Sequence, residues 1–231
     1  MFSKEAQVRE AIHARSRFSR GLMRAGAVSC FTACIGDFVV TSLLSMLYPG
    51  YNFIEQSESL LSVSGSPVAH WVAAWSVVFT GLLVLFALGL QVAFGKTHRG
   101  ITLLCWLVAI YGIGEGLISG LFPYDFVHGR LTVAGQIHAV GGIAGQAGLY
   151  FVPAVAWYAL HGEHPGIKVL SVLVMVAGGV FLLLFGAAKL HLIGYRGLWQ
   201  RLFMGVYFLY LMYLAWLTYR QAGKSQVRAS T

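Results

Sequence analysis

The chain contains six long apolar segments that are separated by shorter polar connections. The segments cover residues 25–47, 68–94, 101–121, 137–160, 169–188 and 202–219. A helix rises about 1.5 Å per residue, so roughly 20 apolar residues cross the hydrocarbon core of a membrane. None of the segments shows the alternating polarity of a membrane β-strand. The pattern predicts an all-α, polytopic membrane protein with six transmembrane helices in one bundle.

The connections are too short to hold a soluble domain, since even the longest of them covers only residues 48–67. The sequence therefore predicts three regions. They are a basic N-terminal arm over residues 1–24, a six-helix transmembrane domain over residues 25–220 and a tail over residues 221–231. The arm precedes a span that is too long for the core of a cleaved signal peptide, so we expect it to remain as a signal anchor.

Composition supports the membrane class, because 58% of the residues are apolar and only 10% are charged, against about 25% charged in soluble domains. Most of the positive residues fall on one side of the predicted spans: Lys4, Arg9, Arg15, Arg17, Arg20, Arg24, Lys96, Arg99, Lys168, Arg220, Lys224 and Arg228. The positive-inside rule then places both termini in the cytoplasm and residues 48–67, 122–136 and 189–201 at the outer face.

We expect this protein in a cell membrane, a bacterial inner membrane, with the lipid bilayer as its surroundings. Its net charge of +8 is accounted for by topology, so nucleic acid is not an expected partner. The sequence does not predict an oligomeric state.

Two carboxylates fall inside the predicted spans: Asp37 is midway along the first, and Glu115 is just past the middle of the third. An ionised carboxylate at this depth costs about 2.5 to 3.5 kcal/mol, so each needs a partner or a proton. Polar residues at helical spacing or similar depth accompany them: Cys30, Cys34, Thr41, Ser45, Tyr111, Ser119 and Gln146. The carboxylates either stabilise helix assembly as a protonated pair or take part in ligand or proton passage.

Glycines at intervals of four mark the third and fourth spans. Gly112, Gly116 and Gly120 lie in the third, and Gly141 and Gly145 lie in the fourth. This spacing lets helix backbones approach closely in lipid. We therefore expect these two spans to lie near the centre of the bundle.

Polar side chains gather in the segments that we expect at the outer face: Glu55, Ser57, Glu58, Asp125, His138, His191, Arg196 and Arg201. Histidine with aspartate can act as general acid and base, histidines with a carboxylate can bind zinc, and arginines can bind phosphate. The diagnostic motifs H-E-x-x-H, G-x-S-x-G and S-x-x-K are absent from the sequence. The identity of any metal or cofactor therefore stays open.

Four short motifs lie in these segments: Y-P-G-Y-N-F-I-E-Q-S-E-S-L at 48–60, F-P-Y-D at 122–125, G-x-x-H at 135–138 and G-L-W-Q-R at 197–201. Together they resemble the domain-of-unknown-function 998 family over nearly the whole chain. The resemblance implies a six-span bundle whose polar positions gather at the outer mouth. It points to Glu55, Ser57, Glu58, Asp125 and His138. A more distant similarity is to a group of six-span proteins that are associated with lipid handling.

The first functional hypothesis is an outward-facing enzyme or binding protein for a lipid or lipid-like, amphipathic small molecule. Asp125 and His138 would act as acid and base, or with a metal, in hydrolysis. Glu58 and Ser57 would assist from the first connection. Further binding positions are Glu55, Gln146, His191, Arg196 and Arg201, with the arginines near a head-group phosphate.

The second hypothesis is a small transporter or proton-coupled channel in which Asp37 and Glu115 form the titrating pair. A third is a b-type haem or quinone protein. Haem ligation requires facing histidines within the spans, whereas the histidines of this chain lie near span ends.

Overall fold

The computed structural model describes residues 2–95 and 98–230 and is 79% helical. Its elements are α1 (Phe2–Met46), η1 (Glu58–Ser62), α2 (Ala69–Phe94), α3 (Gly100–Tyr111), η2 (Gly112–Ile118), α4 (Ser119–Leu121), β1 (Phe126–Val127), β2 (Arg130–Leu131), α5 (Val133–Leu160), α6 (Ile167–Lys189) and α7 (Arg196–Ser230). Within the described residues, six helical stretches are long and apolar enough to cross a membrane. The predicted six-span, all-α membrane fold is confirmed.

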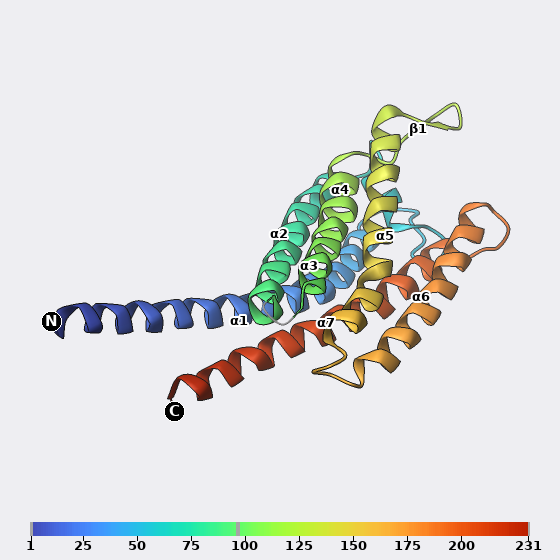
Figure 1. The fold of residues 1–231 in the computed structure, drawn as a ribbon. Helices are drawn as coiled ribbons and strands as arrows, with labels where there is room; N and C mark the ends of the chain where they lie inside the picture. The colour runs from blue at the N-terminus through green and yellow to red at the C-terminus, as the bar shows by residue number, and fades with distance from the viewer. Residues whose placement is uncertain (1, 96–97, 231) are drawn as a thin grey trace.

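The six spans form one elongated bundle. The β1–β2 hairpin and the loop between α6 and α7 lie at one end, and both termini lie at the other (Figure 1). The connection over residues 47–68, which we call the cap loop, lies at the same end as the hairpin. We call this end the hairpin end and the other the terminal end. Helix α1 packs against α2 and α7, and α5 packs against the third span and α6.

The spans begin and end a few residues away from the predicted limits. Helix α5 starts at Val133 because the Thr132 side chain caps it, accepting a hydrogen bond of 3.1 Å from the backbone N–H of Gly135. Helix α7 starts at Arg196, so Arg196 and Arg201 lie in its first turns and not in a loop. Lys96, one of the positive residues of the topology prediction, lies outside the described residues.

Glycines bring the third span and α5 into backbone contact, as their spacing predicts. A Cβ atom on Gly114 would lie 2.6 Å from the carbonyl oxygen of Gly141 and 2.8 Å from the amide nitrogen of Gly145. The position of these spans in the bundle differs from the prediction. The most buried span is α7, with 56% of its apolar window buried, against 39% for each of the other two. Large α7 side chains, among them Tyr207 and Phe208, fill the bundle interior.

The terminal half of the bundle has a tightly packed apolar core. Phe86, Leu90 and Phe94 of α2 pack there with Ile101 and Leu104 of α3, and all five are 1% exposed or less. Side chains of this size leave little room for water. Polar groups are concentrated toward the hairpin end.

The orientation of the bundle in the membrane stays a prediction. In a cysteine-free background, Phe126→Cys in the hairpin should react with a membrane-impermeant thiol reagent in intact cells, because Phe126 is 50% exposed. Lys224→Cys at the terminal end should react only after the cells are permeabilised. The reverse labelling pattern would contradict cytoplasmic termini.

Candidate functional site

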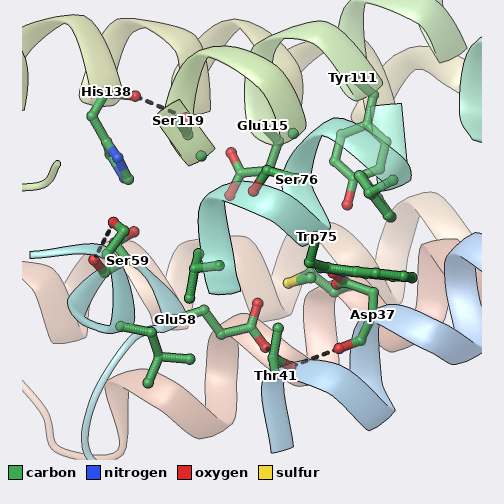
Figure 2. A pocket seen from close by; sticks show the side chains of 17 residues that line it. Asp37, Thr41, Glu58, Ser59, Trp75, Ser76, Tyr111, Glu115, Ser119 and His138 are labelled. Carbon is green, nitrogen blue, oxygen red and sulfur yellow. Dashed lines mark hydrogen bonds between the residues drawn. The ribbon is translucent and has the colours of Figure 1, made fainter. Parts of the chain in front are cut away.

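A polar cavity of about 70 Å³ lies between the cap loop and the helices beneath it. Its polar and aromatic lining residues are Asp37, Thr41, Glu58, Ser59, Ser62, Trp75, Ser76, Phe79, Tyr111, Glu115, Ser119 and His138. Figure 2 shows that these side chains come from α1, the cap loop, α2, the third span and α5. One water requires roughly 10–15 Å³ of such space. The cavity therefore has room for a few waters or one small polar group, but not for a lipid chain.

Asp37 lies on the wall that α1 and α2 share, and its side chain is 8% exposed. The indole Nε1–H of Trp75 donates a hydrogen bond of 2.9 Å to its Oδ1 atom. The Thr41 hydroxyl lies one turn further along α1, 2.8 Å from the Asp37 backbone carbonyl oxygen and 3.3 Å from Glu58 Oε1. The carboxylate is thus fixed by one neutral donor, and no ion pair reaches it among the described residues.

Glu115 enters the cavity from a π-helical turn in the third span, η2. The Thr80 hydroxyl of α2 donates a hydrogen bond of 2.7 Å to the carbonyl oxygen of Gly112, the first residue of this turn. Such wide turns within a helix occur frequently at functional sites. Gln146 of α5 contacts the Glu115 carboxylate, but Glu115 Oε2 is buried without a hydrogen-bond partner.

Within the described part of the chain, two buried polar atoms of the cavity wall therefore have no hydrogen-bond partner. One is Glu115 Oε2, and the other is the hydroxyl oxygen of Tyr111, whose side chain is only 1% exposed. Both residues line the cavity (Figure 2). Buried polar groups are normally hydrogen-bonded, so this pair indicates that a water or ligand belongs in the cavity.

Glu58 and Arg201 form a buried ion pair at the hairpin end of the cavity. Arg201 Nε lies 3.4 Å from Glu58 Oε1, and the two side chains are 5% and 13% exposed, respectively. The distance defines an ion pair, but the Nε–H makes no hydrogen bond. The guanidinium instead donates to the Phe53 carbonyl oxygen at 2.7 Å and to the Tyr51 hydroxyl at 3.0 Å, and it stacks on the Phe53 ring.

Further hydrogen bonds fix the cap loop to the first turns of α7. The backbone N–H of Glu58 donates to Gln200 Oε1 at 2.9 Å, and the N–H of Leu198 donates to the Ile54 carbonyl oxygen at 2.9 Å. Glu55 Oε2 accepts a hydrogen bond of 3.0 Å from the Tyr195 N–H. Glu55 therefore fastens the cap loop and does not line the cavity.

Burial raises the pKa of Glu58, and the charge of Arg201 and the hydrogen bond from Thr41 offset this effect only in part. A carboxyl whose pKa is higher in the folded state stabilises the fold at low pH, and this contribution is lost as the pH rises through the folded-state pKa. Wild-type protein should therefore lose thermal stability relative to Glu58→Gln as the pH rises from about 4 to 7. Melting curves of both proteins across this range test it, and a constant difference would contradict the assignment.

The structure places Asp125 and His138 among different neighbours. Asp125 Oδ1 accepts a hydrogen bond of 2.7 Å from the backbone N–H of Ser64, and the Ser64 hydroxyl bonds Asp125 Oδ2. Both carboxylate oxygens are thus engaged with the cap loop, and Asp125 does not line the cavity. His138 does line it, is 6% exposed and has its Nδ1 atom 2.9 Å from the Phe122 carbonyl oxygen.

The remaining predicted positions are dispersed. Ser57 is buried at 1% exposure and does not line the cavity, whereas Ser59 and Ser62 of η1 line it. His191 lies exposed in the α6–α7 loop, and Arg196 begins α7. Among the described residues, no group of three or more histidine, cysteine, aspartate or glutamate side chains is arranged to bind a metal ion.

The sequence analysis missed three contributors to the cavity: Trp75, Ser76 and Ser59. Trp75 and Ser76 are the seventh and eighth residues of α2. In a sequence, a tryptophan at such a position cannot be distinguished from the other apolar residues of a span. A tryptophan that deep in a membrane still carries an N–H that needs an acceptor. That requirement was the available signal for a contact with Asp37.

The fold and the cavity define a polytopic α-helical membrane protein with an acidic internal cavity toward one end of its bundle. The chain belongs to the family described as Protein of unknown function (DUF998), whose sequence profile matches residues 14–217. This confirms the resemblance that the four short motifs indicated. No curated protein and no solved structure matches the chain.

Proposed function

We propose that the protein moves protons across the membrane, with Asp37 and Glu115 as the proton-carrying groups. The observation that carries this proposal is that both carboxylates line one buried cavity while neither has an ion-pair partner among the described residues. An ionised carboxylate inside a membrane is costly without a cation, so these two groups hold protons unless a cation is bound beside them.

The surroundings of the two carboxylates support exchange of protons with water. The cavity has room for a few waters, and hydroxyl groups of Thr41, Ser76 and Ser119 line the space around Asp37 and Glu115. Waters and hydroxyl groups both donate and accept hydrogen bonds, so they can pass a proton between carboxylates. Under the predicted topology this exchange is with the outer solution.

The apolar core of the terminal half excludes an open water channel in this conformation. Protons therefore pass by a change in helix packing that exposes the carboxylates to the other side. The π-helical turn η2 is the place for such a change, because it carries Glu115 and packs through Gly114 directly on the α5 backbone.

Proteoliposomes with an internal pH dye provide the test. A potassium gradient together with valinomycin sets a membrane potential across the liposomes. The internal pH should then change faster in liposomes that contain the wild-type protein than in protein-free liposomes, with acidification when the interior is negative and alkalinisation when it is positive. Equal rates with and without protein would overturn the proposal.

A second candidate function is general-base hydrolysis at the mouth of the cavity, and the orientation of His138 favours it. Its Nδ1 atom faces the Phe122 carbonyl oxygen, so Nδ1 carries the proton and Nε2 is left as the base. Ser59 then replaces Ser57 as the hydroxyl that shares the cavity with His138. Loss of esterase activity in His138→Gln, with proton movement unchanged, would support this function over the first.

A further inference from the structure

We infer that the cavity binds the ammonium group of a small primary amine, which takes the place of one of the protons on Asp37 and Glu115. The inference uses the same two carboxylates as the proposed proton movement and in that respect rests on it. It names the chemical class of ligand that the cavity wall selects.

The described cavity wall is rich in acidic groups. Asp37, Glu58 and Glu115 all line it, and the Arg201 cation beside Glu58 is already bound to Glu58 and to the cap-loop backbone. Lys189 at the end of α6 is close enough to interact electrostatically with Glu115, but its ammonium group lies over the Phe185 ring at 4.8 Å. A ligand that fits must therefore bring donors and positive charge.

The unpartnered oxygen atoms of the cavity wall indicate how many hydrogen-bond donors a ligand should bring. Glu115 Oε2 and the Tyr111 hydroxyl are buried without partners, and one oxygen of the Asp37 carboxylate remains after Trp75 has bonded the other. A primary ammonium group has three N–H donors, one for each of these acceptors. A quaternary ammonium has none and would leave all three unsatisfied.

Three aromatic side chains also line the cavity. Trp75, Phe79 and Tyr111 line the cavity, with ring centroids 6.4 Å apart for Trp75 and Phe79 and 5.8 Å apart for Phe79 and Tyr111. Aromatic faces attract organic cations, whereas they supply no ligand atoms to a metal ion. Together with the lack of a metal-binding cluster among the described residues, this favours an amine over an inorganic cation.

Binding exchanges charge for charge. One of the two carboxylic acids releases its proton to water and becomes a carboxylate, and the ammonium group supplies one positive charge in place of that proton. Two carboxylates against one ammonium leave a net negative charge unless one acid keeps its proton, so we expect one proton to be released for each amine bound. At about 70 Å³ the cavity takes the ammonium group and one or two carbons, with any longer chain directed toward the cap loop.

Isothermal titration calorimetry of the purified full chain with ethylammonium chloride tests the inference. Repeating the titration in buffers of different ionisation enthalpy counts the protons released. Wild-type protein should bind ethylammonium with release of about one proton, and tetramethylammonium should bind at least roughly tenfold more weakly because it lacks donors. Potassium chloride serves as the ionic-strength control.

Variants locate the site. Tyr111→Phe keeps the ring but loses the hydroxyl, and it should weaken ethylammonium binding roughly tenfold. The double variant Asp37→Asn, Glu115→Gln should abolish proton release, whereas Glu163→Gln in the exposed α5–α6 loop should behave as wild type. Should the double variant fail to fold, Tyr111→Phe and the comparison of the two ammonium ions still test the inference.

No binding of ethylammonium, equal binding of tetramethylammonium or binding without proton release would each overturn the inference. Failure of the amine inference and failure of the proposed function are distinguishable. Proton movement in amine-free liposomes with no amine binding refutes the inference alone. Amine binding without proton movement refutes the proposed function alone.

Discussion

Arg201→Met is expected to lower the free energy of unfolding by about 3–5 kcal/mol, the range for removing one partner of a buried ion pair. The change leaves the Glu58 carboxyl buried without its cation, and it removes the donor from the Phe53 carbonyl oxygen and the Tyr51 hydroxyl. The cap loop loses its main attachment to α7 as a result. Thermal unfolding of the purified protein, followed by tryptophan fluorescence, measures the effect.

Matched variants separate this effect from a general loss of positive charge. Arg220→Met removes an exposed arginine of the same helix, whose guanidinium lies over the Trp216 ring. This substitution should lower the free energy of unfolding by much less than Arg201→Met does. Adding Glu58→Gln to Arg201→Met should restore part of the stability, because the unpaired carboxylate is gone. Equal melting temperatures for Arg201→Met and Arg220→Met would contradict the assigned role.

Asp37→Asn and Glu115→Gln are expected to reduce proton movement in proteoliposomes by at least about a hundredfold, or to the protein-free background. Losing a proton-transferring side chain has effects of this size, because an amide does not accept a proton at neutral pH. Both substitutions conserve shape, and Asn can still accept the Trp75 hydrogen bond. The pH dye in the liposome interior reports the rate.

The control for these variants is again Glu163→Gln, whose carboxylate is exposed between α5 and α6. It should move protons at the wild-type rate. Melting temperatures of Asp37→Asn and Glu115→Gln should be close to that of the wild type, since each exchanges a neutral acid for a neutral amide of similar shape. A stable, correctly folded Asp37→Asn protein with wild-type proton movement would rule Asp37 out as a proton carrier.

The spans and the position of Asp37 and Glu115 within them were predictable from the sequence for simple physical reasons. A bilayer requires a fixed length of apolar helix, and a carboxylate within that length is conspicuous because it is costly. The spacing of Asp37 and Thr41 along α1 also predicted that they share a face, and both line the cavity.

The contacts of the cap loop were not predictable, because they join residues that are far apart in the chain. Asp125 binds Ser64, 61 positions earlier, and Arg201 binds Phe53, 148 positions earlier. Helix order in a bundle decides such contacts, and spacing within one segment does not determine that order. The 3₁₀ turn η1 likewise decides that Ser59 faces the cavity and Ser57 does not.

The most direct test is infrared spectroscopy of the protein in lipid at neutral pH. The difference spectra of wild type against Asp37→Asn and against Glu115→Gln isolate the carbonyl stretch of each group. The account predicts a protonated carboxylic acid band for both residues that shifts in heavy water, which shows that the protons exchange with solvent. Ionised carboxylate bands in both difference spectra, or acid bands that do not shift in heavy water, would contradict it.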